Sequence, residues 1–158
     1  MNGLSVARSS HDKRGEFQTL GSIGNIYNHT GRYQEALTQY RVALDLAREI
    51  GDQVGEAETL SNIGTMYRQM NRYEDALVQF SASLDVWRKI GNKRGEAQIL
   101  NNLGTIQQSK TDYVNAMISF QTSLKLKRSI GDREGEANTL ANIGYTYAAT
   151  GKTTDAFQ

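Results

Sequence analysis

The sequence GDQVGEAETLSNIG at residues 51–64 decides the fold, because it returns twice at a fixed offset of 40 residues. It recurs as GNKRGEAQILNNLG at residues 91–104 and as GDREGEANTLANIG at residues 131–144. Residues 51–90 and 91–130 are identical at 15 of 40 positions without a gap. A fixed period of this length indicates a stacked array of one repeated supersecondary unit.

Each repeat has the pattern of two helices. Apolar or small residues follow one another at spacings of three or four along each half of the repeat. In residues 51–90 they are Ala57, Leu60, Ile63, Gly64 and Tyr67, then Tyr73, Ala76, Leu77, Phe80, Leu84 and Ile90. Gly51 suits a left-handed position after a helix, and Asp52 can cap the next helix. The pattern predicts helices over 13–29, 33–50, 53–70, 73–90, 93–110, 113–130 and 133–150.

A glycine recurs inside the first helix of every repeat, at Gly24, Gly64, Gly104 and Gly144. Glycine costs about 1 kcal/mol relative to alanine within a helix. We therefore expect a bulky side chain of the second helix to occupy the space that a Cβ atom would fill. Neither helix can bury its apolar stripe alone, so stacking of the repeats must form the core.

These residues resemble the signature of the tetratricopeptide repeat. The family's large apolar residue on the first helix is matched by Leu20, Leu60, Leu100 and Leu140, and its glycine by the four glycines above. Its alanine on the second helix is matched by Ala36, Ala76, Ala116 and Ala156. Its aromatic residue is matched by Tyr40, Phe80 and Phe120. The 40-residue period is similar to that of kinesin light chains, Pins-type adaptors and bacterial multi-repeat proteins. The resemblance implies an all-α, right-handed superhelical solenoid of antiparallel helix pairs.

The repeat register divides the chain, which we interpret as one array over residues 1–158. Residues 1–10 match the tail of a preceding second helix, and three repeats follow over 11–50, 51–90 and 91–130. Residues 131–158 form a truncated fourth repeat. Because neither end has the pattern of a polar capping helix, we expect a fragment of a longer array, with possible end-to-end self-association through its uncapped ends.

The composition excludes several functions. With 18 basic and 17 acidic residues, the chain lacks the charge excess typical of nucleic-acid or anionic-membrane binding. It has no cysteine for thiolate chemistry, and His11 and His29 do not have metal-ligand spacing. Gly151-Lys152-Thr153 lacks the rest of a phosphate-binding loop. We predict a cytoplasmic protein, not an enzyme, without cofactor, metal or catalytic residues.

The resemblance also implies that the first helix of each repeat lines a concave groove. The exposed face of these helices is rich in amides and hydroxyls, and a carboxamide offers a donor and an acceptor as a peptide bond does. The predicted peptide-binding residues are Asn25, Asn62, Thr65, Arg68, Gln98, Asn101, Asn102, Asn142 and Tyr145. The alternative is that the asparagines bond neighbouring helices and hold the superhelix.

The function predicted from these observations is a protein-interaction scaffold that binds an extended segment of a protein or peptide partner. The competing hypothesis is a regulatory or sensor segment that acts in cis within a larger enzyme or signalling protein. Trp87 is either an interface anchor or packs against the next repeat. Lys127 stands at the equivalent position, which predicts that this position is partly exposed.

Overall fold

The computed structural model describes residues 12–151, which form seven α-helices of 17 residues each. They are α2 (Lys13–His29), α3 (Tyr33–Glu49), α4 (Gln53–Gln69), α5 (Tyr73–Lys89), α6 (Lys93–Ser109), α7 (Tyr113–Ser129) and α8 (Arg133–Ala149). Every predicted helix is present, with its ends within one residue of the predicted ones. The predicted helix tail at 1–10, His11 and residues 152–158 lie outside the described residues.

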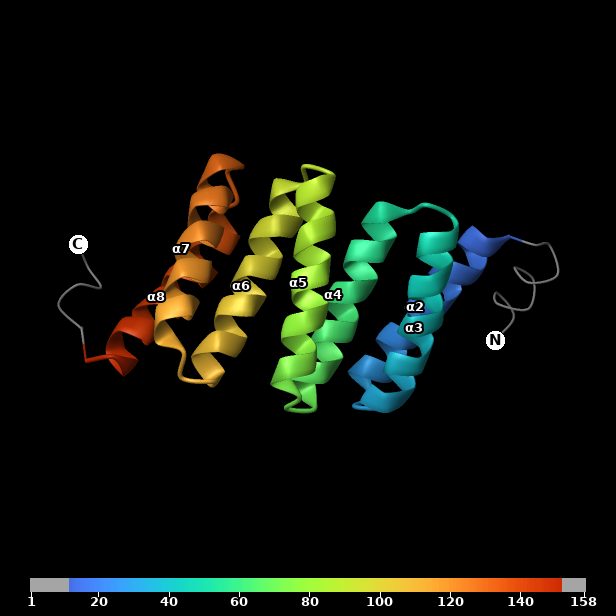
Figure 1. The fold of residues 1–158 in the computed structure, drawn as a ribbon, viewed down its shortest axis with the longest axis horizontal. Helices are drawn as coiled ribbons and strands as arrows, with labels where there is room; N and C mark the ends of the chain where they lie inside the picture. The colour runs from blue at the N-terminus through green and yellow to red at the C-terminus, as the bar shows by residue number, and fades with distance from the viewer. Residues whose placement is uncertain (1–11, 152–158) are drawn as a thin grey trace. The chain divides into compact units, whose positions relative to one another are not determined.

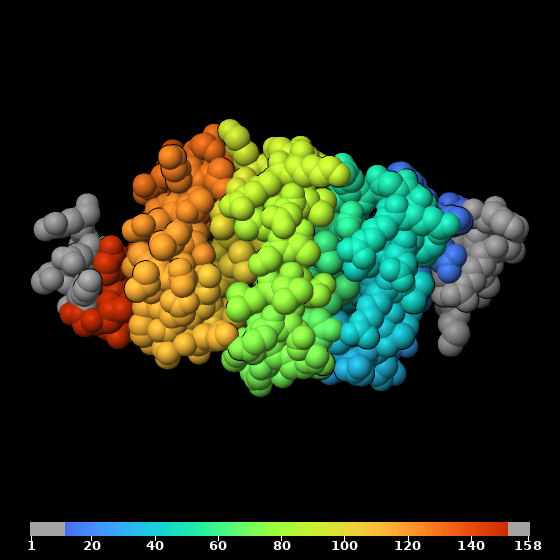
Figure 2. All heavy atoms as spheres, in the orientation of Figure 1, coloured from blue at the N-terminus to red at the C-terminus, as the bar shows by residue number. Residues whose placement is uncertain are grey.

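The chain divides into two compact parts, residues 1–86 and 87–158. In the first part α2 packs against α3, and α3 packs against α4; in the second part α6 packs against α7, and α7 against α8. Within each part, consecutive helices run in opposite directions (Figure 1). Side chains fill the space between the α6 and α7 ribbons (Figure 2). The described helices are therefore sequential antiparallel pairs, and none of them has the length and hydropathy to cross a membrane.

The helix ends follow the predicted capping pattern. The Asp52 carboxylate accepts a hydrogen bond from the backbone N–H of Gly55 at 2.9 Å. Gly51 has φ +70°, the left-handed conformation that ends a helix without steric cost. Thr111 takes this place between α6 and α7 with φ 60°. A β-branched residue is strained there, so this turn stores unfavourable backbone energy.

The recurring glycine makes room for an aromatic ring, as predicted. A Cβ atom on Gly104 would lie 2.6 Å from Cε1 of Phe120, a ring that is 0% exposed. Gly64 faces Phe80 and Gly24 faces Tyr40 in the same way. The helices of a repeat therefore approach closely at each of these glycines.

The end of the described core departs from the pattern. Leu140 was predicted to lie on the apolar stripe of its repeat, but 43% of its surface is exposed. The neighbouring Thr139 is 0% exposed, and its equivalents Thr59 and Ile99 are buried as well. Leu140 is exposed because, within residues 12–151, no helix covers its face of α8.

Arginines at the ends of the second helices link each repeat to the next. The Nε atoms of Arg48, Arg88 and Arg128 lie 2.8, 2.8 and 2.7 Å from carboxylate oxygens of Glu56, Glu96 and Glu136, respectively. Each pair bridges the turn between a second helix and the following first helix. Because the arginine side chains are half exposed, each pair contributes about 1 kcal/mol or less.

The position shared by Ala47, Trp87 and Lys127 is buried, with exposures of 0%, 6% and 7%. The prediction of a partly exposed position is therefore wrong. The Trp87 indole packs against the backbone of Gly95, at the start of the next repeat. This contact confirms the packing interpretation of Trp87.

Candidate functional site

The nine predicted binding residues all lie on the first helices of the repeats, α2, α4, α6 and α8. Asn25, Gln98 and Tyr145 are exposed; Asn62, Thr65, Arg68, Asn101, Asn102 and Asn142 are half-buried. Each of the two parts therefore presents its own amide-rich surface, one on α2 and α4 and the other on α6 and α8.

In the first part, α4 carries Asn62, Thr65 and Arg68 at a spacing of three, which places them along one helix face. The Thr65 hydroxyl donates to the backbone oxygen of Ser61 at 3.0 Å. The side chains of Asn62 and Arg68 have no hydrogen-bond or ion-pair partner within residues 12–151. Their donors and acceptors are therefore available to a ligand.

Asn25, the predicted residue of α2, has a structural contact. Its Oδ1 atom accepts a hydrogen bond of 2.6 Å from the hydroxyl of Tyr40, which lies on α3. Burial raises the pKa of this phenol, so it stays protonated and continues to donate. Asn25 thus satisfies the one polar atom of a core ring.

In the second part, the amides of α6 and α8 bond one another. Asn101 Oδ1 accepts from Thr139 Oγ1 at 3.1 Å and from Asn142 Nδ2 at 3.3 Å. Gln108 Nε2 donates to Thr146 Oγ1 at 2.8 Å. For Asn101 and Asn142 the structure thus shows the helix-bonding contacts of the alternative interpretation.

Asn102 differs from these neighbours on α6 and α8. The residue is half-buried, and its carboxamide has no hydrogen-bond partner in the described part of the chain. It occupies the position in its repeat that Asn62 occupies in the preceding one. Among the half-buried amides of the predicted set, Asn62 and Asn102 are those whose side chains have no hydrogen-bond partner within residues 12–151.

Lys127 extends the network of the second part and was missed as a site residue. Its Nζ atom donates to Thr139 Oγ1 at 2.8 Å and to the backbone oxygen of Gly135 at 3.1 Å. Burial lowers the pKa of the Lys127 ammonium, and the nearby Asp132 carboxylate acts in the opposite direction. The sequence signal was a lysine at a position that is apolar in two other repeats.

A polar pocket of about 360 Å³ opens beside Lys127, between the first turns of α6 and α8. It contains one predicted residue, Gln98. Its lining residues are Arg94, Gln98, Lys127, Asp132, Glu134, Gly135 and Asn138. The pocket therefore combines two cationic, two anionic and two amide side chains.

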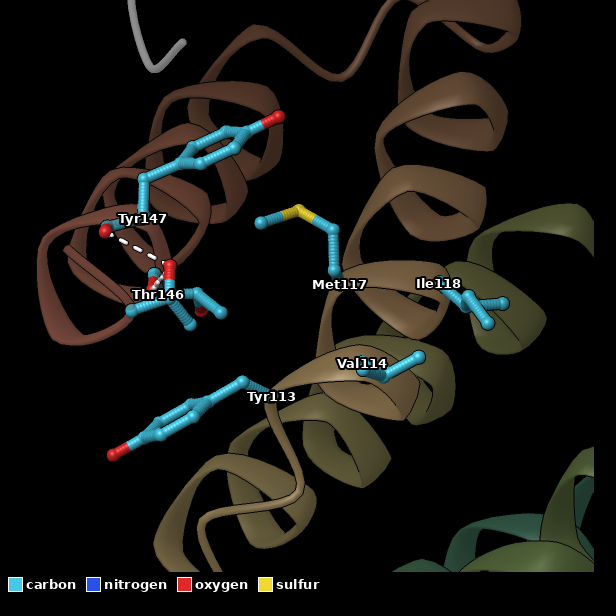
Figure 3. A pocket seen from close by; sticks show the side chains of 7 residues that line it. Tyr113, Val114, Met117, Ile118, Thr146 and Tyr147 are labelled. Carbon is cyan, nitrogen blue, oxygen red and sulfur yellow. Dashed lines mark hydrogen bonds between the residues drawn. The ribbon is translucent and has the colours of Figure 1, made fainter. Parts of the chain in front are cut away.

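A second, apolar pocket of about 400 Å³ lies between α7 and α8. Its walls are Tyr113, Val114, Met117, Ile118, Thr146, Tyr147 and Thr150. In Figure 3 the Met117 side chain extends into the space between the two helices, towards Tyr147. None of the predicted binding residues belongs to it. Within residues 12–151, no three His, Cys, Asp or Glu side chains are placed to hold a metal ion.

The chain matches the profile of the tetratricopeptide repeat family over residues 15–89 and 57–129. It matches none of the curated protein sequences with which it was compared.

Three solved structures have a similar fold. BtubC (BKLC) from P. vanneervenii has a TM-score of 0.83 and 21% identity, over 92% of this chain and 60% of that one. The apo form of RapI has a TM-score of 0.84 and 18% identity, over 89% and 51%. Aspartyl phosphate phosphatase F from Bacillus subtilis has a TM-score of 0.86 and 15% identity, over 89% and 37%. The chain thus spans 37 to 60% of the length of these proteins.

Proposed function

Because this chain belongs to the tetratricopeptide repeat family, we propose that it is a protein-interaction module whose first helices bind the backbone of an extended partner segment. The observation that carries the proposal is the state of Asn62 and Asn102. Both residues are half-buried at equivalent positions, and neither side chain has a hydrogen-bond partner within residues 12–151. No unpartnered side-chain N or O atom of the described residues is buried, so these amide groups are accessible to the backbone of a bound segment.

The surrounding residues support this function in different ways. Asn101 and Asn142 hold α6 and α8 together, so their amides keep the surface beside Asn102 in place. Arg68 offers a guanidinium without a carboxylate partner in the described residues, which suits a carbonyl or carboxylate of the partner. An extended segment loses conformational freedom on binding, so we expect an affinity near micromolar.

The test is selection of random 12-residue peptides from a displayed library on the full chain. The same library is applied to an Asn62→Ala/Asn102→Ala variant. A matched control, Gln34→Ala/Gln121→Ala, removes two exposed amides from the second helices α3 and α7. Circular dichroism checks that all three proteins have the same helix content.

We expect enriched peptides to bind the asparagine variant about tenfold or more weakly, since each lost hydrogen bond costs about 0.5–1.5 kcal/mol. They should bind the control as they bind the unaltered chain. Equal binding to all three proteins would place the site elsewhere. A library from which nothing is enriched would contradict the proposed function.

A further inference from the structure

The polar pocket of the second part is built from equivalent positions of two successive repeats. Arg94 of α6 corresponds to Glu134 of α8, and Gln98 corresponds to Asn138. Within each helix the charged residue and the amide are four residues apart, so they share one helix face. The pocket therefore has a row of two opposite charges beside a row of two amides.

Arg94 and Glu134, which we call the rim charges of the pocket, do not form an ion pair with each other. Arg94 and Glu134 are exposed, and neither forms an ion pair within residues 12–151. Other charges of this part do pair, as Arg128 does with Glu136 at 2.7 Å. Arg94 lines the pocket from α6 and Glu134 lines it from α8.

The other two charged residues of the pocket, Lys127 and Asp132, which we call its floor, already have hydrogen-bond partners. The Lys127 ammonium bonds Thr139 and Gly135, and Asp132 accepts from the Gly135 N–H at 3.0 Å. Lys127 and Asp132 also attract each other electrostatically. A ligand therefore meets the two unpaired rim charges and the two amides, while the floor keeps its own partners.

We propose that this pocket selects an acidic and a basic side chain two positions apart in the bound segment. Side chains at positions i and i+2 of an extended chain lie on the same side, about 7 Å apart. The acidic side chain would pair with Arg94 and the basic one with Glu134, while Gln98 and Asn138 bond the backbone between them. This inference rests on the proposed function, since the segment must lie across α6 and α8.

The first part lacks the same arrangement. The positions that correspond to Arg94 and Glu134 hold Arg14 on α2 and Val54 on α4. An opposite pair of rim charges is therefore a property of the α6–α8 surface, and the acidic-basic preference should depend on this pocket alone.

The test applies the 12-residue peptide library to the unaltered chain and to Arg94→Glu/Glu134→Arg. This variant keeps the net charge and reverses the rim. The control, Asp45→Lys/Lys125→Asp, exchanges two exposed charges on the second helices. Should the reversed variant lose helix content, Arg94→Gln and Glu134→Gln replace it.

We expect peptides from the unaltered chain to contain an acidic and a basic residue two positions apart. They should bind the reversed variant about tenfold more weakly and the control unchanged, with the difference reduced in high salt. Exchanging the two charges within a peptide should restore its binding to the reversed variant.

Two failures can be told apart. Peptides that depend on Asn62 and Asn102 but show no charge pattern, or no rescue by the exchanged peptide, would overturn this inference and leave the proposed function standing. A library that yields no binder on any of these proteins would overturn both.

Discussion

Gly104 and Gly144 occupy the same position on α6 and α8, so the two alanine substitutions form a matched pair. A Cβ atom at Gly104 would lie 2.6, 2.7 and 2.9 Å from three carbons of the Phe120 ring. That ring is 0% exposed and belongs to the buried core with Ala116 and Ile143. At Gly144 the same Cβ atom would meet no heavy atom within 4 Å in the described structure.

The expected magnitudes follow from these contacts. Both substitutions gain about 1 kcal/mol of helix propensity. At Gly104 the added methyl group overpacks the core, which costs about 1–3 kcal/mol, and the buried ring places it in the upper half of that range. We expect Gly104→Ala to lose about 1–2 kcal/mol of unfolding free energy and Gly144→Ala to gain up to about 1 kcal/mol.

The assay is urea unfolding followed by circular dichroism, with amide hydrogen exchange to locate the change within α6, α7 and α8. A third variant, Gly104→Ala/Phe120→Leu, should be less destabilised than the sum of its single changes because the smaller side chain makes room for the methyl group. The reasoning is refuted if Gly104→Ala is as stable as Gly144→Ala.

Three further predictions concern single features of the fold. Thr111→Gly should raise the unfolding free energy by about 1 kcal/mol because it relieves the left-handed backbone. Thr105→Gly, within α6, should instead lower it by about 0.3–0.5 kcal/mol, the difference in helix propensity. Burial lowers the pKa of Lys127, so on raising the pH the folded state releases this proton before the unfolded state does. The unfolding free energy of the unaltered chain should therefore rise relative to that of Lys127→Met as the pH approaches the ordinary lysine pKa of 10.5. A difference in unfolding free energy that stays constant across that pH range would contradict this prediction. A double-mutant cycle on Arg128→Ala and Glu136→Ala should give a coupling of about 0.2–1 kcal/mol that shrinks in high salt, and salt-independent coupling would exclude an exposed ion pair.

Much of the candidate site could be located from the sequence. The repeat register placed all nine predicted residues on first helices, because a helix keeps equivalent positions on one face. The register could not separate Asn102, whose amide has no partner in the described residues, from Asn101, which accepts two hydrogen bonds. Adjacent positions on a helix point in different directions, and only the packed neighbour decides which of them it contacts.

Lys127 shows the limit of reasoning from residue type. Lysine at a variable position normally indicates exposure, since a buried ammonium is costly. Here Thr139 and the carbonyl of Gly135 supply partners from the next helix, so the side chain is 7% exposed. The unpaired charges of Arg94 and Glu134 were equally hidden, because they share a pocket only after α6 and α8 have packed.

The sequence alone determines the elements of this protein: the 40-residue period, the seven helices, their caps, and the glycine that admits an aromatic ring. These features depend on residues close in the chain or on a strict repeat, so local chemistry specifies them. Tertiary structure decides which polar atoms are left without a hydrogen-bond partner. Hydrogen bonds and ion pairs between helices form or fail with differences of a few tenths of an ångström in the distance between the two atoms. The binding properties proposed for Asn102 and for the α6–α8 pocket belong to that second level.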